Sequence, residues 1–365
     1  MSITSQQIAL LLHCLPKIGP VKIKQLIDFF KERSKILEVN NHKHFKIKGI
    51  GPAHLSEIRR WEMHLISVKK EEKFFQKKGL KLFAYGDKNY PITLQNIADP
   101  PTVFFQKGEV NWANRRIISV VGTRVPSEQG IKDCRRLIKE LAPYQPIIVS
   151  GFARGIDIIA HQTAMDLGLE TVAVIGHSFT RWYPPEHRVY VDKILARGAF
   201  ISEFWSTDPF KPSNFLRRNR IIAGLAHATI VIESGKKGGS LATAHQALSY
   251  GREVFALPGR TDDPKSEGCL QLIKRDLARL ITCGKDMAIW LAWEKAETTQ
   301  AVQQQLFLHL TKLEQEVLNH LKETISLDTL ALKMQRPVGH LASILMELEL
   351  KGVVRSFAGK RFEMI

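Results

Sequence analysis

The chain lacks the features that mark several large classes of protein. Its 365 residues include only four cysteines, at positions 14, 134, 269 and 283, and no two of them form a Cys-x-x-Cys pair. This spacing fits no zinc site and predicts buried thiols in a reducing, cytoplasmic setting. No run approaches the roughly 20 consecutive apolar residues of a membrane-spanning helix, and the first residues lack a secretory signal pattern. We therefore expect a cytoplasmic protein with no membrane segment.

Two nucleotide-binding fingerprints are also missing. There is no Gly-x-Gly-x-x-Gly turn followed by a ribose-binding acid, which argues against a redox dinucleotide. There is no Gly-x-x-x-x-Gly-Lys-Ser/Thr loop, which argues against a P-loop nucleotide hydrolase. No Ser–His–Asp or Cys–His set stands out from the order of residues. The sequence therefore predicts no cofactor and no metal site, and it favours a binding protein over an enzyme.

Acidic residues are scarce relative to basic ones. The chain has 53 Lys and Arg against 36 Asp and Glu, a net charge of +17. Such an excess favours a polyanionic partner, chiefly nucleic acid, although a basic surface can also serve solubility alone. About half of the excess lies in residues 1–80, which contain 16 basic and 7 acidic side chains.

Residues 1–80 are expected to form a helical domain. Two glycine–proline turns, at Gly19 and Gly51, each precede a short apolar-periodic stretch. They resemble the helix-hairpin-helix module, in which the N–H groups of the turn hold a backbone phosphate. An ordinary helical hairpin with a glycine cap gives the same pattern. In either case the region presents a basic surface.

The central part of the chain alternates strands and helices. Residues 81–114, with Pro100 and Pro101, are expected to be a connector, in which Val103-Phe104-Phe105 and Gly108 can form a short strand and a turn. Residues 115–290 are expected to form an α/β domain, an extended Rossmann-like, doubly wound sheet. Its strands should be the nearly continuous apolar runs 117–121, 147–150, 171–175, 199–203, 228–233, 253–257 and 279–282. Ligands of such sheets bind at the carboxyl ends of the strands.

Four segments near that edge combine glycine, hydroxyl or arginine side chains with the start of a helix: 122–130, 150–157, 214–220 and 234–243. Backbone N–H groups and the helix dipole favour an anion there. Arginine adds a forked donor that suits phosphate. The segments together predict a phosphate-lined groove. Its predicted DNA-binding residues are Gly122, Thr123, Arg124, Ser127, Gly151, Phe152, Arg154, Gly155, Asp157, Arg217, Asn219, Arg220, Gly239, Ser240 and Thr243.

Several of these side chains have alternative roles. The arginines expected to neutralise phosphates are Arg124, Arg154, Arg217 and Arg220. Phe152 can stack on a base or fill the core. Asp157 is expected to cap a helix and orient Arg154, whereas Arg218 can equally point to solvent. His161 is expected to bond the loop or touch phosphate, with a catalytic role as the alternative.

The C-terminal part of the chain resembles a second DNA-binding module. Residues 291–310 are expected to be a linker, and residues 311–365 three helices and a hairpin, as in a winged helix. From residue 301 onward there are only 8 basic and 7 acidic residues. We therefore expect a protein-contact or structural role for this domain, with duplex binding as the alternative.

Five motifs occur in order along the chain. They are Val120-Val121-Gly122-Thr123-Arg124, Ser150-Gly151-Phe152-Ala153-Arg154-Gly155-Ile156-Asp157, Arg218-Asn219-Arg220, Gly239-Ser240-Leu241-Ala242-Thr243 and Leu257-Pro258-Gly259. With them the chain resembles the DprA/Smf family of DNA-processing proteins over its whole length. The resemblance implies a protein that binds and protects single-stranded DNA during natural transformation and loads the RecA recombinase onto it, without catalysis. It also implies a homodimer formed through the Rossmann-like domain.

One enzyme class remains an alternative. The Gly-Gly-Ser loop on a Rossmann-like sheet also resembles nucleotide phosphoribohydrolases of the cytokinin-activating type. Those enzymes carry a glutamate shortly after the glycine–threonine run. Here Thr243 is followed by Ala244, His245, Gln246 and Ala247, without a carboxylate. This departure favours the DNA-binding hypothesis.

Overall fold

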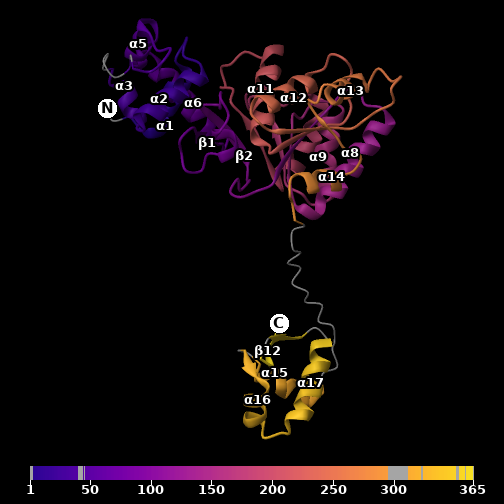
Figure 1. The fold of residues 1–365 in the computed structure, drawn as a ribbon. Coiled ribbons are helices and arrows are strands. Elements are labelled where there is room, and N and C mark those ends of the chain that lie inside the picture. The colour runs from indigo at the N-terminus through magenta and orange to yellow at the C-terminus, as the bar shows by residue number, and fades with distance from the viewer. Residues whose placement is uncertain are drawn as a thin grey trace. The chain divides into compact units, whose positions relative to one another are not determined.

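The chain folds into two compact units, residues 1–296 and 297–365 (Figure 1). The computed structural model describes residues 3–39, 44, 46–294, 311–321, 324–350, 353–357 and 359–364. Within these ranges no helix combines the length and the apolar character needed to cross a bilayer.

The first unit begins with short helices. They are α1 (Ser5–Cys14), α2 (Pro20–Phe30), α3 (Arg33–Leu37), α5 (Pro52–Arg59) and α6 (Leu65–Lys77), with a 3-10 turn at Trp61–His64. Gly19 and Gly51 are the N-caps of α2 and α5. A proline follows each of them at the first helical position, where the missing N–H costs no hydrogen bond. Both glycine turns of the sequence therefore begin helices.

Nine strands form one sheet, in the order β1-β2-β6-β5-β4-β3-β7-β8-β9. They are β1 (Lys81–Ala84), β2 (Val103–Gly108), β3 (Ile117–Val121), β4 (Ile147–Ser150), β5 (Thr171–Val174), β6 (Gly198–Ser202), β7 (Ala228–Val231), β8 (Glu253–Ala256) and β9 (Arg279–Leu280). Neighbours among β3 to β9 are parallel. The doubly wound sheet expected from the apolar runs is confirmed, with strand ends within two residues of the prediction.

Residues 81–114 are more than a connector, which corrects the prediction, while the short strand expected from Val103 onward is present as β2. β1 and β2 extend the sheet beyond β6 through antiparallel pairing, and the short helix α7 (Ile92–Gln95) lies between them. Phe83 pairs with Phe104 across the two strands, and their rings stack 4.9 Å apart. The prolines that suggested a connector lie just before β2, where they interrupt no strand hydrogen bond.

Helices cover both faces of the sheet (Figure 1). They are α8 (Glu128–Leu141), α9 (Ile156–Asp166), α10 (Val191–Leu195), α11 (Pro212–Leu225), α12 (Gly239–Ser249), α13 (Glu267–Lys274) and α14 (Gly284–Trp290). Residues of α11 and α12 share an apolar cluster with Val121 of β3, whereas residues of α8, α9 and α14 share another with Val120. Because successive strand residues point to opposite faces, the two clusters lie on opposite sides of the sheet.

Buried polar contacts fix the N-terminal helices to the sheet. Glu71 of α6 is 2% exposed and accepts hydrogen bonds from the backbone N–H of Ser206 at 3.0 Å and from its hydroxyl at 2.5 Å. Burial raises the pKa of Glu71, and the Ser206 bonds oppose that shift. Lys24 of α2 donates to the carbonyl oxygens of Gln95 and Ile97, at 2.9 and 3.2 Å. α6 thus holds the loop that runs from β6 to α11, and α2 holds the end of α7.

The second unit is a winged helix. It contains α15 (Lys312–Asn319), α16 (Leu327–Met334) and α17 (Val338–Leu350), and a three-stranded sheet of β10 (Ile325–Ser326), β12 (Arg361–Met364) and β11 (Val354–Phe357). Val317, Leu330 and Leu345 are fully buried in its core. The greater part of the predicted linker, residues 295–310, lies outside the described residues.

Candidate nucleic-acid interface

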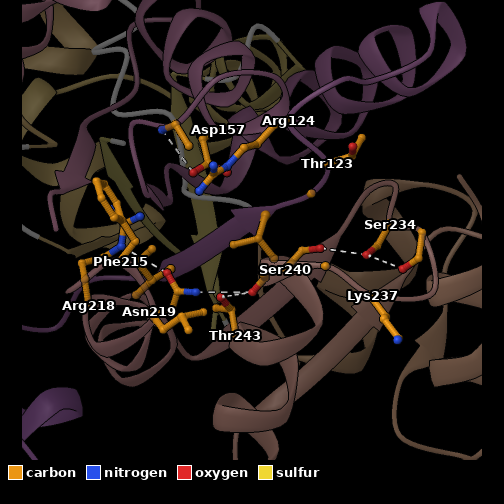
Figure 2. A pocket seen from close by; sticks show the side chains of 18 residues that line it. Thr123, Arg124, Asp157, Phe215, Arg218, Asn219, Ser234, Lys237, Ser240 and Thr243 are labelled. Atoms are coloured by element: carbon orange, nitrogen blue, oxygen red, sulfur yellow. Dashed lines mark hydrogen bonds between the residues drawn. The ribbon is translucent and has the colours of Figure 1, made fainter. Parts of the chain in front are cut away.

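The strand order of the parallel sheet changes direction beside β3. β4, β5 and β6 follow on one side of β3, whereas β7, β8 and β9 follow on the other. The loops that leave the carboxyl ends of β3 and β7 therefore diverge and open a crevice, where ligands of this type of sheet bind. A cavity of about 290 Å³ lies there, surrounded by the side chains in Figure 2. We call it the switch-point pocket.

Four chain segments line the switch-point pocket: the turn after β3, the start of α9, the first half of α11, and the loop from β7 into α12. Eight of the predicted residues meet there: Gly122, Thr123, Arg124, Asp157, Asn219, Gly239, Ser240 and Thr243. The other seven do not line it: Ser127, Gly151, Phe152, Arg154, Gly155, Arg217 and Arg220. The structure adds Phe215, Arg218, Ser234 and Lys237, which the sequence prediction missed.

The start of α12 supplies backbone donors. Its N-cap is Gly238, and no side chain caps the helix. The hydroxyl of Ser240 is turned to Ser234, at 2.9 Å, and that of Thr243 to the carbonyl oxygen of Gly239, at 3.2 Å. The first N–H groups of α12, which lack a partner within the helix, thus border the pocket together with the positive end of the helix dipole. This arrangement binds anions.

A buried arginine lies beside a buried carboxylate at the pocket wall. Arg218 is 3% exposed, and its Nη1 donates to the carbonyl oxygen of Gly151 at 2.6 Å and to that of Val174. Asp157 Oδ2 accepts hydrogen bonds from the N–H groups of Gly151 and Ala153, at 3.1 and 3.3 Å. The two side chains therefore hold the turn after β4 in one shape.

Charge at the pocket favours an anion. Burial lowers the pKa of Arg218 to about 10, with Asp157 opposing the shift and the positive charge of Arg124 adding to it. Burial raises the pKa of Asp157, and the Arg218 charge opposes that rise. Arg124 is exposed at the pocket mouth, so two guanidinium groups repel one another across the cavity. An anion between them would relieve this repulsion.

Two glycines allow this close packing. A side chain at Gly151 would place its Cβ 2.6 Å from Asp157 Oδ2 and 2.7 Å from an Arg218 nitrogen. Gly155 has φ +75°, and a Cβ there would lie 2.3 Å from the carbonyl oxygen of Thr123. Neither residue lines the pocket, but both are needed for the turns that do.

The turn after β4 otherwise departs from the prediction. Phe152 is 1% exposed and packs edge-on against Phe200, with ring centroids 5.0 Å apart, so it fills the core and cannot stack on a base. Arg154 points outward and pairs with Glu186 instead of being oriented by Asp157. His161 is fully buried beside Thr171, and burial lowers its pKa to about 3. Its ring is therefore a neutral core group that does not line the switch-point pocket.

Arg220 and Arg217 are bound to a carboxylate of the protein itself. Arg220 is 4% exposed and pairs with Glu203, which corrects its assignment as a phosphate ligand. Arg217 is 48% exposed and donates to the same Glu203 oxygen at 2.9 Å. It lines a different cavity, which is described below.

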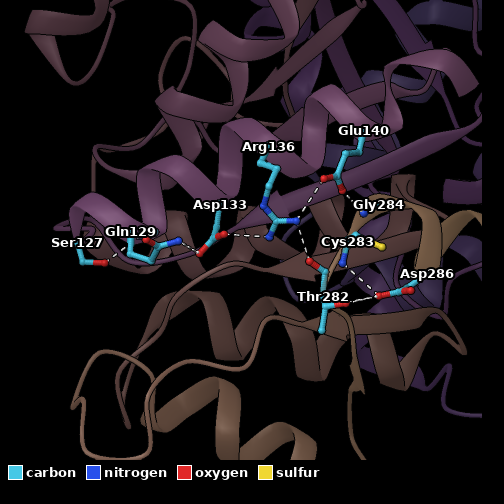
Figure 3. Close-up of polar contacts among 10 residues, drawn as sticks. Ser127, Gln129, Asp133, Arg136, Glu140, Thr282, Cys283, Gly284 and Asp286 are labelled. Carbon is cyan, nitrogen blue, oxygen red and sulfur yellow. Dashed lines mark hydrogen bonds and ion pairs between the residues drawn. The ribbon is translucent and has the colours of Figure 1, made fainter.

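Ser127 has a structural role. Its hydroxyl accepts the N–H of Gly130 as N-cap of α8 and donates to Glu233 at 2.8 Å. Further along α8, Arg136 donates to the carbonyl oxygen of Thr282 at 2.8 Å and so ties α8 to the segment before α14 (Figure 3). Ser127 thus supports the pocket from behind by fixing α8.

An aromatic cluster opens to solvent beside the pocket. Tyr183, Phe210 and Phe215 have ring centroids 5.1 to 5.8 Å apart, and Tyr183 and Phe210 are 42% and 38% exposed. Phe215 also lines the switch-point pocket. The guanidinium of Arg181 lies 5.4 Å from the Phe210 ring centre. Such faces accept nucleobases by stacking.

Comparison with known proteins agrees with this architecture. The sequence model of the family described as DNA recombination-mediator protein A matches residues 81–292, and that of the DprA winged helix domain matches residues 298–360. The chain is 35% identical to Protein Smf of Escherichia coli over 74% of both chains. It is 36% identical to DNA processing protein DprA of Bacillus subtilis over 58% of this chain and 72% of the relative.

Two solved structures share the fold. DNA processing protein A of Streptococcus pneumoniae superposes with a TM-score of 0.65 at 31% identity, over 80% of this chain and 99% of that one. DNA processing protein A of Helicobacter pylori, described with a unique single-stranded DNA binding mode, has a TM-score of 0.53 at 25% identity, over 59% of this chain and 97% of that one.

Fold and site together define a Rossmann-like protein with a C-terminal winged helix and a pocket at the switch point of its sheet. The chain belongs to the DNA recombination-mediator protein A family, also called DprA/Smf.

Proposed function

We propose that this protein binds and protects single-stranded DNA, with the strand's phosphates in the switch-point pocket. One observation carries the proposal: Arg124, Arg218 and the uncapped start of α12 face one cavity that opens beside an exposed aromatic cluster. The cations and N–H groups suit phosphates of any sequence. The rings of Tyr183 and Phe215 can reach bases only when these are unpaired, which favours a single strand over a duplex.

The pocket favours binding over catalysis. Asp157 is the only carboxylate among the described residues that line it. That carboxylate is held by two backbone N–H groups next to Arg218 and is not free to shuttle protons. A nucleotide phosphoribohydrolase would need such a group. We therefore infer a role without catalysis, and release of free base from a panel of nucleoside monophosphates would contradict it.

Salt dependence tests the pocket directly. Arg124→Ala should weaken binding of labelled oligo(dT) and reduce the log–log salt slope by roughly 0.7, the value for one released phosphate contact on a single strand. Arg135→Ala is the matched control, because it removes the same charge from an exposed position on α8 that does not line the pocket. Equal effects of the two substitutions in fluorescence anisotropy would refute the pocket as the binding site.

Family membership supports a finer role. We infer that the protein acts in the cytoplasm during natural transformation and loads the RecA recombinase onto the strand it protects. The expected result is that the protein accelerates RecA filament assembly on single strands already covered by a competing single-strand binder. An unchanged assembly rate would contradict RecA loading while leaving DNA binding intact.

A homodimer through the Rossmann-like domain is also proposed. β9 is an outer strand of the sheet, and Leu280, Ile289 and Trp290 around it are 51%, 68% and 51% exposed. Apolar surface at an unpaired sheet edge favours association with a second copy. Leu280→Asp should convert dimers to monomers in mass photometry, and a wild-type protein that is monomeric at micromolar concentration would refute the dimer.

A further inference from the structure

A second cavity lies beside α11, between the first glycine turn and the sheet. Its volume is about 330 Å³. The residues that matter in its lining are His13, Lys17, Gly19, Thr102, Glu203 and Arg217. Leu216 and Arg218, the chain neighbours of Arg217, line the switch-point pocket instead. The two cavities therefore flank the same turns of α11. We call the second cavity the hairpin pocket.

The floor of the hairpin pocket requires a hydrogen-bond donor. Glu203 is 1% exposed, and its Oε2 accepts from Arg217 and Arg220. Its Oε1 has no hydrogen-bond partner among the described residues. An unsatisfied buried acceptor is costly, and a carboxylate oxygen most of all. His13 does not supply the missing donor to Glu203 Oε1. Burial lowers the pKa of His13 to about 3, which leaves the ring neutral, and its Nδ1 is hydrogen-bonded to Thr102 Oγ1 at 2.6 Å.

The rim of the hairpin pocket, in contrast to its floor, favours a negatively charged group. Gly19 is the N-cap of α2, an 11-residue helix whose start carries no side-chain cap. Lys17 and Arg217 lie at the mouth and are 67% and 48% exposed. Lys17 is paired with Glu57 at 3.0 Å, so Arg217 and the start of α2 supply most of the positive potential. A free anion suits this rim but not the carboxylate floor, and a free cation suits the floor but not the rim. A nucleotide offers a phosphodiester for the rim and base N–H groups for the floor.

We propose that the hairpin pocket binds one nucleotide of the strand that occupies the switch-point pocket. Its phosphate lies at the start of α2 beside Arg217, and its base donates to Glu203 Oε1. This inference rests on the proposed function and extends the DNA path from the sheet onto the N-terminal helices. The strand crosses α11 at Leu216, which is 57% exposed.

The glycine turns provide a matched pair of variants. Gly19→Asp places a carboxylate at the N-cap of α2, where aspartate stabilises a helix by accepting its first N–H groups. Gly19 has φ −78°, and a Cβ there meets no atom within 4 Å, so the fold is preserved. The same substitution at Gly51, with φ −124° and equally open space, adds the same charge at the start of α5, and Gly51 does not line the hairpin pocket.

Oligonucleotide length separates the two pockets. Oligo(dT) of about four nucleotides reports on one pocket, and oligo(dT) of about twenty on both. Gly19→Asp should weaken binding of the longer strand roughly three- to tenfold, the loss expected for one charge-assisted contact. It should leave the shorter strand unaffected, and Gly51→Asp should leave both at wild-type affinity in fluorescence anisotropy.

Three outcomes would overturn the inference. The first is that Gly19→Asp binds the longer strand with wild-type affinity, and the second is that Gly51→Asp weakens binding equally. The third is that Gly19→Asp binds DNA normally but no longer binds RecA, which would assign the hairpin pocket to a protein. Failure of the proposed function looks different. In that case the wild type binds neither strand, or Arg124→Ala changes neither affinity.

Discussion

Arg218→Met is expected to destabilise the first unit strongly. The guanidinium of Arg218 is buried, donates to the carbonyl oxygens of Gly151 and Val174, and lies beside the buried Asp157. Methionine keeps the apolar stem and removes only the charge and the donors. The substitution leaves the buried Asp157 carboxylate without the positive charge beside it, and removing one of two opposite buried charges costs roughly 3–5 kcal/mol. In a unit of this size such a loss lowers the Tm by roughly 10 °C.

The loss should also depend on pH. Burial already raises the pKa of Asp157, and the Arg218 charge limits the rise, so the substitution raises this pKa further. A folded-state pKa above the unfolded one means that the folded protein holds a proton that the unfolded chain releases. The stability of the variant therefore falls as pH rises through the folded-state value of Asp157. The difference from wild type should be smaller at about pH 5 than at about pH 8.

A double-mutant cycle provides the assay. Urea unfolding followed by circular dichroism would compare the wild type, Arg218→Met, Asp157→Asn and the double variant at both pH values. Removing the Asp157 charge should restore part of the stability lost with Arg218, with a coupling energy of roughly 1–3 kcal/mol. Additive losses, or a deficit of Arg218→Met that is the same at both pH values, would refute the account of this buried pair.

Three further outcomes are expected. Gly155→Ala should lower the free energy of unfolding in urea by at least roughly 2 kcal/mol, because φ is +75° and the new Cβ would meet Thr123. Gly79→Ala, with φ +62° and open space, is the control and should lower it by about 1 kcal/mol. Equal losses in the two variants would contradict the packing of the turn. Burial lowers the pKa of His161 from its ordinary value of 6.5 to about 3. Just below pH 6.5 only the unfolded chain therefore binds a proton at His161, so the stability of the fold should decrease as the pH drops. His161→Asn should make this decrease smaller in thermal melts. Ending the chain after residue 296 should preserve affinity for single strands in anisotropy, and a large loss would place the winged helix on the DNA.

Local apolar content was enough to predict the sheet. The strands β3 to β7 are buried on both faces, so their sequences are continuous apolar runs that differ from the helical pattern. β1 and β2 give a weaker signal, since β1 carries exposed Lys81 and β2 begins two residues after Pro101. Their place in the sheet depends on pairing with distant β6, which local pattern does not show.

The pocket was predicted only in part because α11 begins earlier than expected. The sequence pattern predicts that residues 214–220 lead into a helix, whereas the helix itself starts at Pro212. Extending the helical period back from Ile222 would have placed Phe215, Arg218 and Asn219 on one face, and Arg217 on another. The proline at the first helical position was the available signal. The identity of Arg220 as an internal ion-pair member was not available, because it depends on the burial of Glu203.

The walls of the switch-point pocket are held by contacts within the protein itself. Arg218 and Asp157 already hold the turn after β4, and Ser240 and Thr243 are already anchored at the start of α12. A site that needs no rearrangement does not slow the association step, and a cationic surface increases the rate at which DNA collides with the protein. The association rate constant should therefore be high and should fall strongly with added salt. Differences in affinity among DNA strands should come mainly from their dissociation rate constants.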